Sequence, residues 1–262
     1  MRIIDFHTHI YPDAIARKAA DNVREFYDGI GNSGIDGKVE TLLEHGKTAG
    51  ITEFAILPVA VVPTRTRHIN DFIVREAATH SEFYGFGTVH AAMDGLMEEV
   101  DYIMQNGLRG IKIHPDYQTF AIDDPRMFPV YEQIQGKLPV VFHMGDLRYD
   151  YSHPARLRKV LDQFPELQVV AAHFGGYQMR DVAREVLTDT NCLFDTSSSL
   201  IFMEPGVAEE HIRHYGADRF MYGTDFPMWD PVVEVERFFN LDLTDDEKEQ
   251  IAWKTAAQLL RV

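Results

Sequence analysis

The stretches Val140-Val141-Phe142 and Val169-Val170-Ala171-Ala172 are apolar at every position. A strand with one face in water alternates apolar and polar residues, whereas a parallel strand covered on both faces does not. We therefore expect both stretches to be buried parallel strands. Each is followed by a segment long enough for a helix, which is the pattern of a βα unit.

Further short apolar stretches of this kind recur along the chain, so that eight βα units are predicted. The strand candidates are residues 3–7, 54–59, 83–89, 110–114, 139–143, 168–173, 192–196 and 219–224. Helical signals between them include residues 93–106 and 154–164, and Thr244 and Glu247 form a capping box at the start of the last helix. A distorted (β/α)8 TIM barrel of the α/β class, built as a single domain over residues 1–262, fits this pattern best.

The composition excludes several classes of partner. A formal net charge of −16 opposes binding to a phosphate backbone, so no nucleic-acid partner is expected. No stretch approaches the roughly 20 apolar residues of a membrane span, and the N-terminus lacks the apolar core of a signal peptide. We expect a cytoplasmic protein that acts on a small molecule, without a membrane partner. A homodimer is the commonest soluble assembly and is left open.

Cysteine usage restricts the chemistry of any metal site. Cys192 is the only cysteine of the chain, so an intramolecular disulfide and a thiolate metal cluster are both excluded. Any metal ion must therefore be held by nitrogen and oxygen. Histidine is the abundant source of such ligands, with twelve in the chain.

The segment Asp5-Phe6-His7-Thr8-His9, at the end of the first predicted strand, carries the strongest chemical signal. Residues two apart in an extended segment project to the same side, so His7 and His9 can bind one ion. A lone pair of this kind is also compatible with two surface or hydrogen-bonded histidines. Four further candidates end other predicted strands: His114, His143, His173 and Asp225. Because the carboxyl ends of all strands meet at one rim of a parallel barrel, we expect the whole set to gather there.

Five segments together resemble a known superfamily over nearly the full length of the chain. They are Ile4-Asp5-Phe6-His7-Thr8-His9, Gly110-Ile111-Lys112-Ile113-His114-Pro115, Pro139-Val140-Val141-Phe142-His143, Val170-Ala171-Ala172-His173-Phe174-Gly175-Gly176 and Tyr222-Gly223-Thr224-Asp225-Phe226-Pro227. The chain resembles the amidohydrolase superfamily, specifically the amidohydrolase-related (amidohydrolase 2) branch of metal-dependent hydrolases. That branch also contains non-oxidative decarboxylases similar to aminocarboxymuconate semialdehyde decarboxylase. The motifs are more specific for the superfamily than for the reaction.

The resemblance implies a site with one divalent ion. Its ligands would be His7, His9, His143 and Asp225, with zinc the first expectation and manganese or magnesium the alternatives. His173 and Asp225 are the expected catalytic residues: Asp225 accepts a proton from water, and His173 polarises a carbonyl or acts as an acid. Zinc suits such nitrogen and oxygen ligands and lowers the pKa of a bound water toward roughly 7.

Substrate binding is assigned to four other residues near the predicted rim: Lys112, His114, Arg148 and His153. Lys112 also raises the alternative of a carboxylated lysine that bridges two ions, although the Lys-x-His-Pro element of this branch favours one. Arg148 can hold a substrate carboxylate through two hydrogen bonds, with a solvated loop as the equally weighted alternative. Residues just beyond strand ends are weaker candidates for specificity: Asp116, Tyr177, Arg180 and Trp229.

Three functions remain open at this point. The first is hydrolysis, in which metal-bound hydroxide attacks an amide, ester or lactone carbonyl. The second is non-oxidative decarboxylation of a small hydroxy, keto or aromatic carboxylic acid, and the third is a barrel that binds without turnover. The compactness of the chain favours hydrolysis over decarboxylation. Residues 29–37, which are rich in glycine, are either an active-site lid or a surface loop.

Overall fold

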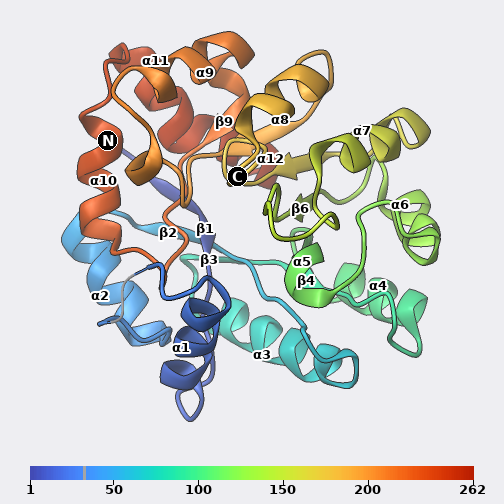
Figure 1. Ribbon diagram of the computed structural model, residues 1–262. Helices are drawn as coiled ribbons and strands as arrows, with labels where there is room; N and C mark the ends of the chain where they lie inside the picture. Colours follow the sequence, from blue (N-terminus) through green and yellow to red (C-terminus); the bar gives the residue numbers. More distant parts are fainter. Residues whose placement is uncertain (32–33) are drawn as a thin grey trace. The chain divides into compact units, whose positions relative to one another are not determined.

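The computed structural model describes residues 1–31 and 34–262 (Figure 1). The described chain forms two compact units. The terminal unit consists of Met1–Ile56 and Thr196–Val262, and the central unit consists of Leu57–Asp195. The expectation of a single domain stays a prediction. Asn32 and Ser33 lie outside the described residues, so the choice between a lid and a surface loop for residues 29–37 also stays open.

The terminal unit contains strands from both ends of the chain, with helices between and after them. In order they are β1 (Ile4–Thr8), α1 (Ala16–Phe26), α2 (Val39–Ala49), β2 (Glu53–Ile56), η3 (Leu200–Phe202), α9 (Val207–Tyr215), η4 (Ala217–Arg219), β9 (Phe220–Met221), α10 (Pro231–Phe239), α11 (Asp245–Glu249), the π-helical turn η5 (Gln250–Lys254) and α12 (Thr255–Leu260). β1 and β2 pair in parallel, and α2 packs against α10. The predicted capping box of Thr244 and Glu247 is confirmed at α11.

The central unit alternates strands and helices. Its elements are η1 (Pro63–Arg65), α3 (Thr66–Thr79), β3 (Phe83–Gly85), β4 (Gly87–Thr88), α4 (Leu96–Gln105), β5 (Ile111–Ile113), α5 (Pro115–Gln118), η2 (Pro125–Met127), α6 (Phe128–Ile134), β6 (Val140–Phe142), α7 (Pro154–Gln163), β7 (Val169–Ala171), α8 (Arg180–Leu187) and β8 (Leu193–Asp195). β4 to β8 pair with their sequence neighbours in parallel. Figure 1 shows helices following these strands along the chain.

The strand predictions hold in each of the eight stretches, with one correction. The single strand expected over residues 83–89 is divided at Phe86 into β3 and β4. β6 and β7 are buried along their whole length, which confirms that both faces of these apolar strands are covered. The expected helices over residues 93–106 and 154–164 are present as α4 and α7. In the described part of the chain, no helix is long and apolar enough to span a membrane.

Candidate active site

Backbone pairing within the terminal unit brings the start of the chain to the segment after β9. The Phe6 amide donates to the Tyr222 carbonyl (2.8 Å), and the Asp225 amide donates to the His7 carbonyl (2.7 Å). The His9 amide then donates to the Phe226 carbonyl (2.8 Å). Residues more than 200 positions apart in the sequence are thus held in a parallel pairing, which places Asp225 between the two histidines of the motif.

Asp5 reinforces this pairing from inside the unit. Its side chain is fully buried, and it accepts hydrogen bonds from the Thr224 amide (2.9 Å) and the Thr224 hydroxyl (2.6 Å). It also accepts from the His7 amide at 3.2 Å. The pairing of β1 with β2 is irregular between Asp5 and Thr8, and such bulges re-aim side chains next to active sites. The buried carboxylate of Asp5 therefore fixes the backbone on both sides of the candidate ligands.

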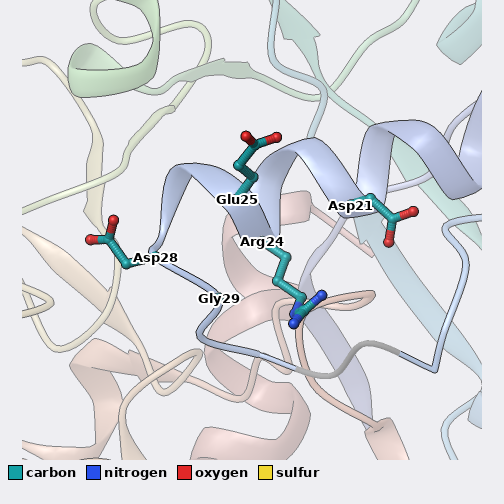
Figure 2. Close-up of a pocket in the computed structure, with 5 residues that line it drawn as sticks. All are labelled: Asp21, Arg24, Glu25, Asp28 and Gly29. Atoms are coloured by element: carbon teal, nitrogen blue, oxygen red, sulfur yellow. The ribbon is translucent and has the colours of Figure 1, made fainter.

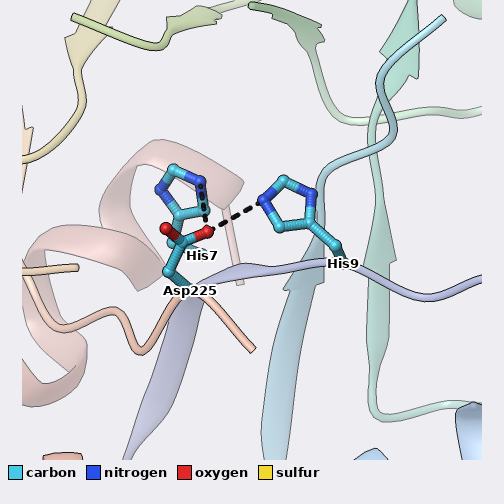
Figure 3. Close-up of side chains that lie close together, drawn as sticks. All are labelled: His7, His9 and Asp225. Atoms are coloured by element: carbon cyan, nitrogen blue, oxygen red, sulfur yellow. Dashed lines mark hydrogen bonds and ion pairs between the residues drawn. The ribbon is translucent and has the colours of Figure 1, made fainter. Parts of the chain in front are cut away.

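Three predicted ligands converge in the terminal unit, as Figure 3 shows. Asp225 Oδ1 lies 3.0 Å from His9 Nε2 and 3.6 Å from His7 Nε2. One ligand atom from each residue lies within 4.8 Å of the others. His7 is buried, whereas the side chains of His9 and Asp225 are 14% and 13% exposed. The cluster therefore has a buried base and a side that reaches the surface.

Two consecutive serines support this cluster. Ser197 Oγ lies 3.0 Å from His7 Nδ1, which leaves Nε2 of that ring directed at Asp225. Ser198 donates from its hydroxyl to Asp225 Oδ2, and Trp229 Nε1 donates to Ser198 Oγ at 2.8 Å. Hydrogen-bond partners of this kind orient metal ligands and select the histidine tautomer. Neither serine was predicted from the sequence, because serine is too common for its position in the chain to indicate a site.

The donor set fits a divalent metal ion. Two imidazole nitrogens and a carboxylate oxygen are ligands that zinc and manganese both accept. The second oxygen of Asp225 and the second nitrogen of His7 are already hydrogen-bonded to serines, so their remaining atoms point to one common location. The terminal unit can therefore hold an ion through His7, His9 and Asp225.

The backbone is unusual at three candidate site residues. Ser198, Asp225 and His173 have φ values of +49°, +64° and +60°. Residues with side chains rarely adopt this left-handed region, and such conformations concentrate at functional sites. In the terminal unit the conformations of Ser198 and Asp225 place the hydroxyl and the carboxylate in hydrogen-bond contact.

The central unit contains a second group of histidines, built from the ends of β5, β6 and β7. His143 Nδ1 and His173 Nε2 are 2.9 Å apart, which is hydrogen-bond distance between the two rings. The His143 ring stacks on that of His114, with centroids 3.9 Å apart and planes within 7°. The His173 amide donates to Asp195 Oδ1 at 3.0 Å, which fixes the backbone after β7. His143 therefore lies with His173 and His114, as adjacent strand ends require.

Asp116 completes this second group. Its carboxylate is 1% exposed and accepts from the Ser152 amide at 3.2 Å. Oδ2 has no hydrogen-bond partner and lies 3.9 Å from His143 Nε2. Burial is the main reason that the pKa of Asp116 rises from 3.8 to about 6, and the nearby charge of Asp146 adds to the rise, while hydrogen bonds from Ser152 and the charge of Arg148 oppose it. His114, Asp116 and His143 also place one ligand atom each within 4.8 Å of one another.

The residues predicted to bind substrate are all in the central unit, and several have structural partners. Lys112 is 1% exposed on β5, and His114 accepts from the Tyr117 amide as the N-cap of α5. His153 caps α7 in the same way by accepting from the Ala155 amide. Their roles toward substrate stay predictions.

Arg148 is engaged by a carboxylate two residues away. Its Nε and Nη2 donate to Asp146 Oδ1 (3.0 Å) and Oδ2 (2.7 Å). The two-pronged geometry that was expected for a substrate carboxylate is thus formed with Asp146, which is fully buried. Substrate binding by Arg148 stays a prediction. It would require the guanidinium to be shared between Asp146 and the substrate.

His90 is a further candidate that was not predicted from the sequence. It lies two residues after the end of β4, near the strand-end positions of the other candidate histidines. The side chain is 6% exposed, its Nδ1 accepts from the Ala92 amide at 3.0 Å, and its ring lies 5.2 Å from that of Phe120. Burial lowers the pKa of His90, which favours a neutral ring.

A hollow at the end of α1 is separate from these residues (Figure 2). It is lined by Asp21, Arg24, Glu25, Asp28 and Gly29. Figure 2 shows the acidic side chains pointing in different directions rather than toward one point. None of the predicted site residues lines this hollow, and the candidate chemistry lies in the two histidine groups.

Comparison with known proteins identifies the family and the fold. The amidohydrolase family model matches residues 4–262. An uncharacterized TIM-barrel protein from Bordetella bronchiseptica has a similar structure, with a TM-score of 0.82, 21% identity and coverage of 100% of this chain and 99% of that chain. A 5-carboxyvanillate decarboxylase from Sphingomonas paucimobilis gives a TM-score of 0.79 at 18% identity, with coverage of 100% and 99%.

Two further similarities are to proteins with named activities. A dihydroxybenzoic acid decarboxylase from Polaromonas, solved with manganese and the inhibitor 2-nitroresorcinol, gives a TM-score of 0.77 at 16% identity and covers 99% of this chain and 97% of that chain. A dihydroorotase of Mycosarcoma maydis is 25% identical over 162 residues, or 52% of this chain. That match spans only 39% of the dihydroorotase. The chain belongs to the amidohydrolase family and is a TIM-barrel enzyme of that superfamily.

Proposed function

We propose that this enzyme is a metal-dependent, non-oxidative decarboxylase of a small hydroxylated aromatic or keto acid. The observation that carries the proposal is the convergence of His7 Nε2, His9 Nε2 and Asp225 Oδ1 in a fold shared with decarboxylases over complete chains. This reverses the order of the two reactions expected from the sequence, where compactness favoured hydrolysis. The compact chain aligns with whole decarboxylase chains, so its length does not count against that reaction.

The ion would supply positive charge that binds the hydroxyl or keto oxygen and the carboxylate of the substrate. His7, His9 and Asp225 are its proposed ligands in the terminal unit. His143 was predicted as a fourth ligand, and this assignment stays a prediction that metal analysis of a variant can test. Zinc was the first expectation; the manganese of the Polaromonas decarboxylase supports trying that ion as well.

The reaction requires one proton transfer. The bond between carbon and carboxylate breaks, carbon dioxide leaves, and the carbon keeps the electron pair and takes a proton. His173 is the proposed proton donor, since its ring is 1% exposed and lies at hydrogen-bond distance from His143. Asp225, predicted as a catalytic residue, has one oxygen held by Ser198, which favours its role as an oriented ligand.

Hydrolysis is the second candidate function. The similarity to a dihydroorotase favours it, although that match covers 39% of the relative. The same ligands would serve hydrolysis, with His173 polarising the carbonyl that water attacks. The two reactions differ in the bond that breaks, so their products separate them.

The test is a product assay with protein loaded separately with zinc and with manganese. One set of substrates contains 2,6-dihydroxybenzoate and 5-carboxyvanillate, and the other contains dihydroorotate and simple lactones. The proposal predicts release of carbon dioxide from an acid of the first set, abolished in His173→Ala. Ring opening in the second set, with no carbon dioxide from the first, would establish hydrolysis instead.

A further inference from the structure

We propose that Trp229 is a positioning residue of the metal site, which keeps the Ser198 hydroxyl directed at Asp225. The inference rests on the proposed function, because it takes from it that Asp225 is a metal ligand. It deepens that function by adding an aromatic side chain to the residues that determine metal affinity. Three features of the terminal unit support it: the direction of two hydrogen bonds, the backbone at the residues they join, and the anchoring of the indole.

The two hydrogen bonds of the Ser198 hydroxyl have a defined direction. Trp229 Nε1 donates to Ser198 Oγ at 2.8 Å, and the hydroxyl donates to Asp225 Oδ2. An indole N–H is a donor only, whereas a serine hydroxyl has one proton and can either donate or accept. Because Trp229 is the donor to Oγ, the single hydroxyl proton is left for the carboxylate. The indole therefore sets the direction in which the serine presents its proton.

The two oxygens of the Asp225 carboxylate have different partners. Oδ2 accepts from Ser198, whereas Oδ1 lies 3.0 Å from His9 Nε2 and 3.6 Å from His7 Nε2. If the hydroxyl turned away, Oδ2 would lose this bond and the carboxylate could rotate. Hydrogen-bond partners that orient a ligand before it binds raise metal affinity. Loss of the indole N–H should therefore weaken metal binding through Ser198.

The backbone at both ends of the serine–carboxylate bond depends on its surroundings. Ser198 and Asp225 have φ values of +49° and +64°. Residues with side chains keep this left-handed conformation only where neighbouring groups fix it. The bonds from Trp229 to Ser198 and from Ser198 to Asp225 are two such fixings. The same contacts thus hold the side chains and the backbone conformation that directs them.

Trp229 is anchored on both sides along the chain. Before it, the Met228 amide donates to the Asp225 carbonyl at 2.8 Å, which closes a turn that begins at the proposed ligand. After it, Asp230 is the N-cap of α10, and its Oδ1 lies 2.9 Å from His45 Nδ1 of α2. The backbone that carries the indole is therefore fixed independently of the serine, so the indole can position the hydroxyl.

Trp229→Phe removes the indole N–H and keeps an aromatic ring beside Phe202, whose ring lies 5.8 Å from that of Trp229. Zinc dissociation constants are measured without substrate, by competition with a chelator. The variant is expected to bind zinc about three- to tenfold more weakly than the wild type, the usual contribution of one hydrogen bond. Trp253→Phe, which changes the other tryptophan of the chain beside Arg2, is the matched control and should bind as wild type.

The same substitution in a Ser198→Ala background separates positioning from packing. If the indole acts through the hydroxyl, Trp229→Phe causes no further loss of affinity there, whereas a packing defect would add to it. Benzothienylalanine at position 229 has the shape of tryptophan with sulfur in place of the N–H, and it repeats the test without a large change of volume. Two tryptophans give two indole signals in proton–nitrogen correlation NMR, and Ser198→Ala should shift only that of Trp229.

Unchanged zinc affinity in Trp229→Phe overturns the proposal, as does an equal loss with and without the serine hydroxyl. A Trp229 indole signal that Ser198→Ala leaves in place overturns it too. A wild type that binds zinc but releases no carbon dioxide would remove the decarboxylase assignment and keep this inference. A wild type that does not bind zinc or manganese would overturn both.

Discussion

The two histidine groups are supported in different ways. In the terminal unit, serine hydroxyls hold the outer atoms of His7 and Asp225, so that the inner atoms are directed at one another. In the central unit, His143 and His173 bond to each other, and the buried Asp116 Oδ2 has no hydrogen bond. The first arrangement suits a fixed ion, because its ligands are oriented before binding. The second suits proton movement, because His143 and His173 lie at hydrogen-bond distance from each other and beside a buried carboxylate.

The largest effect on metal content and activity is expected when the histidine group of the terminal unit loses its carboxylate, Asp225. Asp225→Asn should lose bound metal and reduce kcat/KM by about a thousandfold or more, since a bound ion supplies several kcal/mol to catalysis. His214→Ala, an exposed histidine of α9, should change neither quantity. Elemental analysis and steady-state kinetics on the two variants check this. Full metal content in Asp225→Asn would contradict the ligand assignment.

The variant His173→Ala should distinguish the role of the central histidine group from that of the terminal one. If the central histidines move protons rather than hold the ion, this variant keeps its metal and loses about 10²- to 10⁴-fold in kcat. The same preparation is analysed for metal content and turnover. Loss of the ion together with activity would show that His173 belongs to the metal site.

Removal of a supporting hydroxyl should give a smaller effect. Ser198→Ala leaves Asp225 in place but frees Oδ2, so metal affinity should weaken about 10- to 100-fold. Ser81→Ala, at an exposed position, is the control. Competition with a chelator measures the dissociation constants. An unchanged affinity would mean that the serine does not orient the ligand.

The buried carboxylate of Asp116 should produce a pH dependence of protein stability. Its pKa in the folded protein is raised from 3.8 to about 6, so the folded state binds more protons than the unfolded state between these values. Stability contributed by the protonated group is therefore lost as pH rises from about 4 to about 6, by up to about 3 kcal/mol. Asp116→Asn should flatten this fall in urea unfolding of the metal-free protein.

Asp124→Asn provides the comparison of opposite sign. The hydrogen bond from Arg126 lowers the pKa of Asp124, so its stabilisation is present at neutral pH and is lost as pH falls below about 4. Asp124→Asn should be less stable than the wild type at neutral pH. Its stability should still decrease between pH 4 and 6 as much as that of the wild type. If Asp116→Asn also leaves that fall unchanged, Asp116 is not the group responsible.

The parts of the molecule that follow periodic rules were predictable from the sequence. Continuous apolar runs predicted β6 and β7, and the spacing of His7 and His9 with a strand-end Asp225 predicted their convergence. The division of residues 83–89 was not predictable, because both halves are apolar enough for one strand. The hydrogen-bond partners of the arginines could not be predicted either. Arg148 and Arg180 both lie in segments that follow a strand, and only the folded chain shows that Arg148 pairs with a carboxylate whereas Arg180 contacts a backbone carbonyl.

The presence of the proposed metal site is tested by the metal content of wild-type protein purified without added metal, compared with His7→Ala and His143→Ala. We predict about one divalent ion per chain in the wild type and almost none in His7→Ala, and loss of the ion in His143→Ala as well would add His143 as the fourth ligand. Retention by His143→Ala alone would limit the ligands to His7, His9 and Asp225, and two ions would support a carboxylated Lys112. A wild type that binds no ion even after reconstitution with zinc or manganese would contradict the metal-dependent mechanism.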